Sequence, residues 1–206
     1  MVKCGRPPKG QELLSRDRVL DSALKLFLEN GYGNLSMEKV ARDAHVSMRT
    51  IYRYFGNKAG LFGAVIRRCS DQFADSLPEF GEPQQALQEF ARHFITRITR
   101  SDVVRIRTIL IGESLRFPEL AAQFYEQGPQ RTLDQLTDFF ARQQRTGHFS
   151  GFDPQRLADH FLSCLRNERF HKLQLGLAPI PDDAEIETWV RQAVEVFLHG
   201  CLSGKR

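Results

Sequence analysis

Apolar residues recur at intervals of three and four in this 206-residue chain, and after Pro83 no alternating run of strand type interrupts that spacing. An interval of three to four residues places apolar side chains on one face of an α-helix. Between the helical stretches stand Gly, Pro, Ser and Asp residues, which end or cap helices. The sequence therefore predicts an all-α fold of nine to ten helices. The predicted helices span residues 13–30, 37–43, 47–53, 58–77, 83–100, 102–116, 118–126, 129–146, 154–175 and 183–202.

Residues 36–62 have the pattern of two short helices joined by a tight turn, followed by the start of a third helix. Ser36 is placed to cap the first helix, whose apolar side chains are three and four residues apart. Ser47 is placed to cap the second helix, in which Ile51 points inward and polar side chains remain on the open side. This is a helix-turn-helix pattern. His45 stands in the turn where Gly is usual, because the backbone there often needs a positive φ, a region that His tolerates.

Positive charge is concentrated in the first third of the chain. Residues 1–60 carry 11 of the 29 Lys and Arg residues but only 6 of the 25 Asp and Glu residues. An anionic partner is therefore expected to bind this third. Residues 1–11, MVKCGRPPKGQ, are basic and hold two prolines and two glycines. They are predicted to be a flexible, non-helical arm.

The cysteines and the hydropathy place the protein in the cytoplasm. The four cysteines, Cys4, Cys69, Cys164 and Cys201, are far apart and form no C-x-x-C pair. We therefore expect reduced thiols. No stretch approaches the roughly 20 apolar residues that span a bilayer, and the N-terminus lacks an apolar signal region, so no membrane partner is expected.

The run SMEKVARDAHVSMRTIYRYFGNKAGLF, residues 36–62, closely resembles the DNA-binding segment of the TetR family of bacterial transcriptional regulators. The resemblance covers roughly residues 15–66 and includes the preceding Gly31-Tyr32. The sequence departs from the family pattern at His45 and at Ala59, where Glu commonly follows the Lys. The segment 112–129, GESLRFPELAAQFYEQGP, is similar to a TetR subgroup whose members often regulate efflux genes.

The helix-turn-helix predicts three sets of contacts with double-stranded DNA. A recognition helix of residues 47–53 inserts its first turn in the major groove, where Arg49 is expected to bind guanine O6 and N7 together. The expected base contacts are Met48, Arg49 and Thr50. The expected backbone contacts are Ser36, Ser47, Tyr52, Arg53, Tyr54 and Lys58. The arm is expected to enter an A·T-rich minor groove with Lys3, Arg6 and Lys9. Two alternatives stay open: one of the two tyrosines only packs, or the arm only aids solubility.

The remainder of the chain is predicted to bind an effector and to dimerise. The predicted domains are the arm 1–11, a helix-turn-helix domain 12–57, and an effector-binding and dimerisation domain 58–206 whose helix 58–77 is the connection. The last two predicted helices are apolar on more than one side, which is typical of burial against both the domain and a second subunit. The predicted dimer-interface residues are Phe161, Leu165, Trp189, Val190, Val194 and Phe197. The predicted pocket residues are Phe94, Ile98, Ile109, Glu113, Phe117, Phe124, Leu136, Phe139, Phe161 and Leu165. The alternative for both sets is that they form only the core.

The resemblance implies a homodimeric repressor that releases a palindromic operator when a small hydrophobic molecule binds. An activator or a ligand-independent regulator of the same fold is the alternative. An enzyme is the remote alternative, because Glu168 and His171 form a Glu-x-x-His pair. A di-iron bundle needs two such pairs and two further glutamates, and only one pair is present. No nucleophile elbow, P-loop, dinucleotide motif or zinc spacing is found. We therefore expect no enzyme activity, cofactor or metal.

Overall fold

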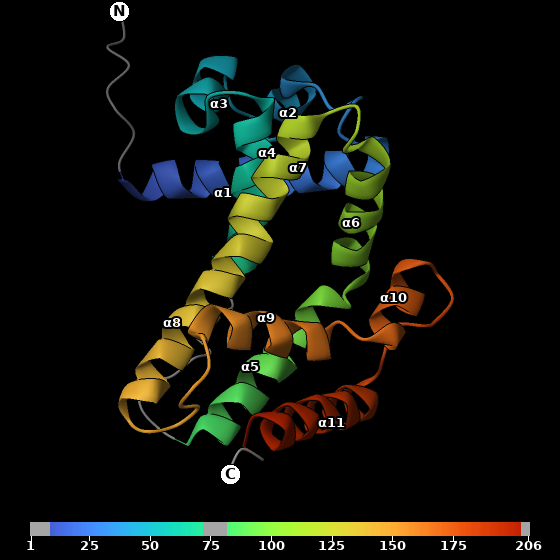
Figure 1. Ribbon diagram of the computed structural model, residues 1–206. Coiled ribbons are helices and arrows are strands. Elements are labelled where there is room, and N and C mark those ends of the chain that lie inside the picture. The colour runs from blue at the N-terminus through green and yellow to red at the C-terminus, as the bar shows by residue number, and fades with distance from the viewer. Residues whose placement is uncertain (1–8, 72–81, 203–206) are drawn as a thin grey trace, which may run out of the picture. The chain divides into compact units, whose positions relative to one another are not determined.

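The computed structural model describes residues 9–71 and 82–202, with side chains from 13–71 and 82–200, and these residues form an all-α fold, as predicted (Figure 1). No strand occurs in the part of the chain that is described. The helices are α1 (Lys9–Asn30), α2 (Met37–Asp43), α3 (Met48–Phe55), α4 (Lys58–Asp71), α5 (Pro83–Ile98), α6 (Ser101–Glu113), α7 (Pro118–Tyr125), a π-helix (Glu126–Gln130), α8 (Arg131–Arg145), α9 (Pro154–Leu165), α10 (Glu168–Gln174) and α11 (Asp183–Leu202).

The first helix begins earlier than predicted. α1 starts at Lys9, so residues 9–11, which were assigned to the flexible arm, are helical. The two prolines of the arm, Pro7 and Pro8, precede Lys9 and do not interrupt the helix, because proline disrupts only the turn that precedes it. The rest of the arm lies outside the described residues, as does the end of the predicted connecting helix, residues 72–77.

The predicted helix 154–175 is two helices. α9 ends at Leu165, and Arg166 has φ −100° and ψ 55°, which leaves the helical region. The side chain of Asn167 then caps α10 by accepting hydrogen bonds from the backbone N–H groups of Arg169 at 3.0 Å and Phe170 at 3.4 Å. The apolar spacing continues across this break and hides it, whereas Asn at an N-cap position is the local signal that shows it.

The predicted break at Gly128-Pro129 is a π-helix instead. Glu126–Gln130 joins α7 to α8 in one continuous helical run, with Pro129 inside it (Figure 1). Proline removes an N–H donor, and a wider turn accommodates its ring without ending the helix. The Gln127 carbonyl oxygen accepts a hydrogen bond from Ser70 Oγ at 2.6 Å.

The described residues divide into two compact units. The first unit comprises the chain up to Arg68 together with Ile109–Phe124, and the second comprises Cys69–Thr108 and the chain from Tyr125 onward. By packing, therefore, α4 up to Arg68 and the α6–α7 corner belong with the helix-turn-helix. The functional division at residues 57 and 58 stays a prediction.

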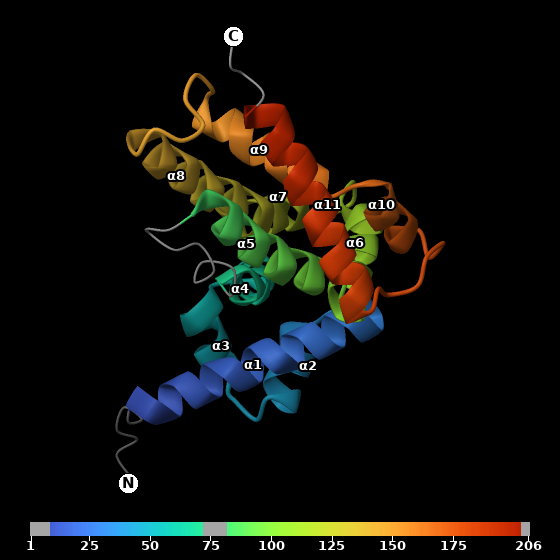
Figure 2. The ribbon, with the colours of Figure 1, turned by 90° about the horizontal axis from the view of Figure 1, so that it is seen from below.

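The core of the second unit is rich in phenylalanine and lies among α5, α8, α9 and α11. In this unit α11 packs against both α5 and α9 (Figure 2). The rings of Phe140, Phe161 and Phe197 contact one another, with centroids 5.0 to 6.5 Å apart. Within the described residues, no helix is both long enough and apolar enough to cross a membrane.

This core contains the residues that were predicted for the dimer interface. Trp189, Val190, Val194, Phe161, Leu165 and Phe197 are all at most 4% exposed within a single chain. Within one chain they are part of the core. Their contact with a second subunit stays a prediction.

Candidate nucleic-acid interface

Both short helices of the helix-turn-helix are capped as the sequence predicts. Ser36 Oγ accepts a hydrogen bond from the N–H of Lys39 at 3.2 Å, and Ser47 Oγ accepts one from Thr50 at 3.1 Å. His45 has a φ of 53°, which confirms that the turn needs the left-handed region. The turn closes where the N–H of Val46 donates to the carbonyl oxygen of Ala41 at 3.0 Å. The start and direction of α3 are therefore fixed by local contacts.

The buried sides of α2 and α3 pack against α1. Val40 and Ile51 have no exposed surface, and Ala44 in the turn is 2% exposed. They share one apolar cluster with Val19 and Leu20 of α1. Burial on this side leaves the opposite side of α3 to face an outside partner.

The exposed side of α3 carries the predicted DNA contacts. Arg49 and Arg53 are exposed, and Tyr52 is 49% exposed. Met48 and Tyr54 are partly buried against the core of the unit, so Tyr54 has a packing role as well. Arg49, Tyr52 and Arg53 are therefore the exposed members of the predicted set on α3, and Tyr52 is more exposed than Tyr54.

Two of these side chains are already engaged with neighbours. The Thr50 hydroxyl lies 2.8 Å from Ser47 Oγ, and Arg53 Nη2 donates to the Tyr54 hydroxyl at 3.1 Å. The Arg53 guanidinium also lies 4.9 Å from the centre of the Tyr54 ring. Ser36 is partly buried and Ser47 is exposed, each at the N-terminus of a short helix. Lys9 lies in α1, and Lys3 and Arg6 lie outside the described residues.

Lys58 holds the turn between α1 and α2. Its Nζ donates to the carbonyl oxygen of Gly33 at 3.2 Å and lies 4.4 Å from the centre of the Tyr32 ring. Burial lowers the pKa of Lys58, while the negative charges of Glu113 and Glu119 oppose that shift. Lys58 is the first residue of α4, as predicted, and its contact with phosphate stays a prediction.

Glu113, predicted to contact an effector, binds the same turn. Its carboxylate accepts hydrogen bonds from the N–H groups of Tyr32 at 2.8 Å and Gly33 at 3.3 Å. The Phe117 ring packs edge-on against Tyr32, with centroids 5.2 Å apart. Burial raises the pKa of Tyr32 to about 12, and the carboxylates of Glu119 and Glu113 contribute to that shift. Glu113 and Phe117 are therefore residues that position the first unit, a role that the sequence reasoning missed.

Six of the other eight predicted pocket residues lie in the core of the second unit, and the contact of this set with an effector stays a prediction. Leu136, Phe139, Phe161 and Leu165 have no accessible surface, so they line no space that admits even a water molecule. Phe94 and Ile98 are 6% and 8% exposed in the same core. Ile109 and Phe124 are partly buried and belong to the first unit. In this structure the set is mostly core.

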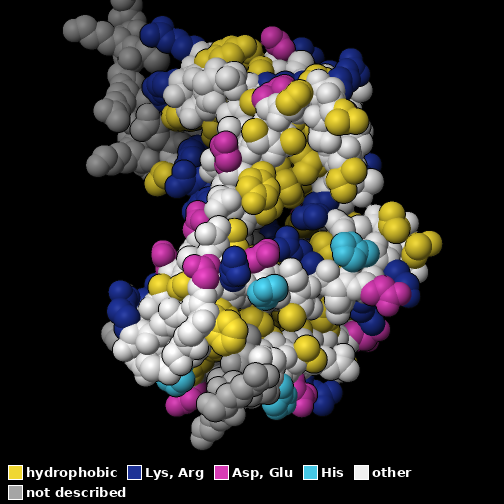
Figure 3. Space-filling model, viewed as in Figure 1, with side chains coloured by type: hydrophobic (Ala, Val, Ile, Leu, Met, Phe, Trp, Pro, Cys, Tyr) yellow, Lys and Arg dark blue, Asp and Glu magenta, His cyan; other side chains and the backbone are white. Residues whose placement is uncertain are grey.

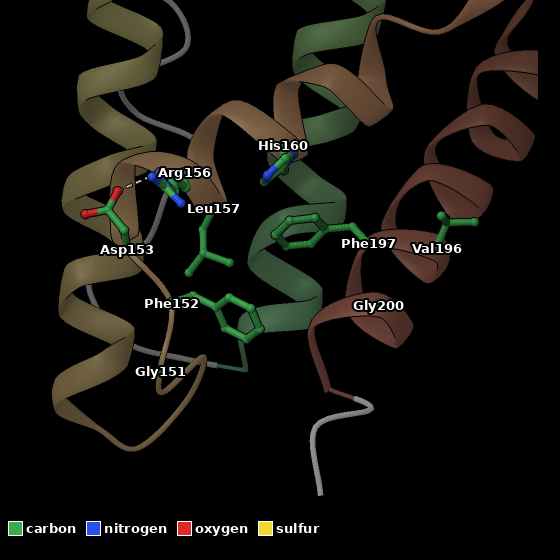
Figure 4. Close-up of a pocket in the computed structure, with 9 residues that line it drawn as sticks. All are labelled: Gly151, Phe152, Asp153, Arg156, Leu157, His160, Val196, Phe197 and Gly200. Carbon is green, nitrogen blue, oxygen red and sulfur yellow. Dashed lines mark hydrogen bonds between the residues drawn. The ribbon is translucent and has the colours of Figure 1, made fainter. Parts of the chain in front are cut away.

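A pocket that the sequence reasoning missed lies in the second unit, where α9 begins and α11 ends (Figure 4). Its volume is ≈ 520 Å³, and the side chains of Phe152, Leu157 and Phe197 converge on it. Asp153 at its edge caps α9 by accepting from the N–H of Arg156 at 2.9 Å. The remaining lining residues are Gly151, His160, Val196 and Gly200.

The described residues hold no group of three or more His, Cys, Asp or Glu side chains placed to bind a metal ion. Glu168, one half of the Glu-x-x-His pair, forms an ion pair with Lys172 at 2.9 Å on the surface. Glu168 therefore has a local electrostatic contact, with Lys172, that needs no metal.

The first three helices share one apolar core, and the third helix is capped at its start. One side of this third helix is buried, and the other carries exposed arginine and tyrosine. This arrangement defines a helix-turn-helix DNA-binding protein. Residues 19–65 match the family described as "Bacterial regulatory proteins, tetR family". Residues 85–200, more than half of the chain, match "AefR-like transcriptional repressor, C-terminal domain". The chain therefore belongs to the TetR family: it is a DNA-binding transcriptional regulator and not an enzyme.

Individual relatives agree with this assignment. The chain is 27% identical over 161 residues to the uncharacterized regulator YvkB of Bacillus subtilis (strain 168), covering 77% of this chain and 83% of YvkB. The structure of Flavonoid-responsive Regulator FrrA is 33% identical, with a TM-score of 0.72, over 91% of this chain and 96% of FrrA. A TetR-family regulator from Mesorhizobium loti MAFF303099 is 26% identical, with a TM-score of 0.77, over 92% and 98% of the two chains.

Proposed function

We propose that the protein is a ligand-responsive repressor that acts in the cytoplasm as a homodimer on a palindromic operator. The observation that carries the proposal is the match of residues 85–200 to a C-terminal domain described as that of a transcriptional repressor. The similar structure of a regulator named as flavonoid-responsive supports a response to a small hydrophobic molecule. In this proposal the helix-turn-helix domain, 12–57, binds DNA, and residues 58–206 bind the effector and the second subunit.

In the proposed complex, Arg49 binds guanine in the major groove, and Met48 and Thr50 contact neighbouring bases. The exposure of Arg49 and its place in the first turn of α3 support its role in binding guanine. The proposed backbone contacts are Ser36, Ser47, Tyr52, Arg53, Tyr54 and Lys58, and the arm residues Lys3, Arg6 and Lys9 enter the minor groove. A dimer sets two α3 helices about 34 Å apart, one turn of DNA, so that they bind both halves of a palindrome.

The exposed sides of α9 and α11 are the proposed dimer interface. Val196 of α11 is 68% exposed, although its neighbours Phe197 and Val194 are buried. His160 of α9 is also exposed and lines the same pocket as Val196. In this proposal the second subunit covers Val196.

The test is sequence-specific DNA binding by the full chain. The DNA flanking the coding region is searched for a palindrome, and its affinity is compared with that of a shuffled duplex at fixed salt, because salt dominates non-specific binding. We expect the palindrome to bind at least about 10³-fold more tightly. Equal affinity for the two duplexes would contradict a regulator with a defined operator. Transcription from that promoter with and without the protein separates repression from activation.

A further inference from the structure

The last described turn of α4 is fastened to the π-helix and to the start of α8. Ser70 Oγ donates a hydrogen bond to the carbonyl oxygen of Gln127 at 2.6 Å. Arg131 Nη2 forms an ion pair with Asp71 Oδ1 at 2.5 Å, and Arg131 Nη1 donates to Ser70 Oγ at 3.5 Å. These four residues, which we call the α4 clamp, all belong to the second unit.

The clamp fixes an orientation rather than adding much stability. Ser70 is 5% exposed, so little water competes for its hydroxyl. The Arg131 and Asp71 side chains are 27% and 51% exposed, and water screens an ion pair of that kind. One guanidinium nevertheless reaches two successive residues of α4, and its planar donors act only in a narrow range of directions. Rotation of the last turn of α4 would therefore break at least one of these contacts.

The clamp lies where the chain passes between the two units. The chain enters the second unit after Arg68, leaves it after Thr108 and enters it again after Phe124. Ser70 and Gln127 each follow an entry by no more than three residues. α4 is one continuous helix that begins shortly after α3 ends (Figure 1). Holding its last turn therefore limits the directions in which α4 can leave the second unit and carry α3.

The surface around the clamp does not suit direct contact with DNA. Figure 3 shows acidic and basic side chains together over α8. On that helix Asp134 and Asp138 are exposed, as is Arg145. Phosphates bind where basic side chains gather, and Arg131 already pairs with a carboxylate. We therefore expect the clamp to affect DNA binding through the direction of α4.

We propose that the α4 clamp sets the half-site spacing that the dimer accepts. Two heads bind both halves of a palindrome only at the right separation, and the second head then binds from a high effective concentration. A narrow range of α4 directions raises that concentration at one spacing and lowers it at others. The clamp residues are thus positioning residues, which act through α4 and α3. The inference rests on the proposed homodimer and palindromic operator.

The experiment uses the full chain and three duplexes at fixed salt. They are the palindrome that flanks the coding region, the same palindrome with two base pairs inserted at its centre, and a single half-site. The insertion moves the halves about 7 Å further apart and turns one relative to the other by about 70°. Fluorescence anisotropy gives the dissociation constants. The spacing penalty is the constant for the inserted duplex divided by that for the palindrome, and we expect about 100-fold for the wild-type chain, because only one head can bind the inserted duplex.

Reversing one charge should open the clamp, and reversing both should close it again. In Arg131→Glu the two carboxylates repel, α4 takes a wider range of directions, and the spacing penalty is expected to fall to about tenfold or less. Its half-site affinity should stay at the wild-type value, because α3 and its contacts lie in the first unit. The double variant Asp71→Lys with Arg131→Glu should regain the wild-type penalty. Ser70→Ala, which lacks the hydroxyl donor, should lower the penalty in the same direction as Arg131→Glu.

A second ion pair of the same unit supplies the matched control. Arg92 on α5 pairs with Glu187 on α11 at 2.7 Å, with both side chains about half exposed. Arg92→Glu creates the same kind of repulsion away from α4 and should keep the wild-type penalty. A purely structural defect would weaken binding to all three duplexes alike and leave the penalty unchanged. Thermal unfolding and sedimentation velocity check that each variant is folded and dimeric.

Four results would overturn the proposal. Arg131→Glu could keep the wild-type penalty, or the double variant could stay as low as Arg131→Glu. Arg92→Glu could lower the penalty equally, which would make the effect a general one. Arg131→Glu could be monomeric, in which case the ion pair serves the dimer and not the direction of α4. If the wild-type chain shows a penalty and Arg131→Glu shows the same one, the dimeric function stands and the clamp fails. If the wild-type chain binds a half-site as tightly as the palindrome, the proposed dimeric function fails and the clamp fails with it.

Discussion

At the scale of single residues, α3 carries two exposed arginines with different expected roles. Arg49 lies in the first turn of the helix, which enters the major groove, whereas Arg53 lies in the last turn and contacts Tyr54. A side chain that reads bases contributes mainly to specific binding, and one that holds phosphate contributes equally on every sequence. Charge and exposure are the same for both residues, so only position separates them.

Replacing Arg49 is expected to remove specificity. In Arg49→Ala, specific binding should weaken by about 1 to 3 kcal/mol, while non-specific binding and its salt dependence barely change. The matched variant Arg53→Ala should weaken binding to all sequences alike and lower the salt slope by about one. Fluorescence anisotropy on the operator and a shuffled duplex at several salt concentrations measures both effects. An equal loss on both duplexes in Arg49→Ala would make Arg49 a phosphate contact.

Tyr32 gives the first unit a dependence on alkaline pH. Its folded pKa is raised from 10.0 to about 12, first by burial and then by Glu119 and Glu113. A raised folded pKa contributes stability that is fully present below pH 10 and is lost as the pH rises through about 12. Two pKa units correspond to about 1 to 3 kcal/mol.

Tyr32→Phe isolates that contribution. Urea unfolding from pH 8 to pH 12 should show that the wild-type chain loses about 1 to 3 kcal/mol more than the variant above pH 10. Tyr52→Phe is the control, because Tyr52 is half-exposed, and it should follow the wild-type curve. Parallel curves for wild type and Tyr32→Phe would mean that the phenol is not buried in solution.

At the scale of the elements, features with a local cause were predictable from sequence and features set by packing were not. The caps at Ser36 and Ser47 and the positive φ of His45 follow from one or two neighbouring residues, and all three are confirmed. The end of α9 was missed because its apolar spacing continues into α10. Glu113 was noticed as a charged residue in an apolar helix, but its partners lie about 80 residues away in the chain, and no spacing rule reaches them.

The turn of the helix-turn-helix stores a small strain at His45. A side chain at φ 53° costs about 1 to 2 kcal/mol, whereas Gly enters this region freely but loses more entropy on folding. His45→Gly is therefore expected to stabilise the chain by up to about 1 kcal/mol, and His45→Val to destabilise it, since β-branched residues avoid this region. Thermal unfolding of both variants measures the difference. A lower stability of His45→Gly would show that the His45 side chain makes a contact that outweighs the strain.

At the scale of the whole molecule, an operator with two halves requires two copies of the chain. The apolar stripes of α9 and α11 were predicted to serve the interface, and their residues are buried in the core of one chain. The apolar surface left on α11 includes Val196, next to the pocket lined by Phe152 and His160. A two-fold symmetric interface uses the same surface of both subunits, so any change at this position is made twice.

Val196→Asp is therefore expected to disrupt the dimer. Each subunit would bring an unpaired carboxylate into the interface, and burying such a charge costs several kcal/mol. Sedimentation velocity should show monomers at concentrations where the wild-type chain is dimeric, and affinity for the full palindrome should fall toward that for a half-site. Leu177→Asp is the control: Leu177 is 72% exposed, in the segment between α10 and α11, and this variant should remain dimeric. Val196 lies outside α3, so the substitution leaves the predicted DNA contacts of α3 unchanged. A Val196→Asp chain that stays dimeric and keeps its operator affinity would place the dimer interface on another surface. A monomer that keeps full affinity would instead remove the need for a dimer in operator binding.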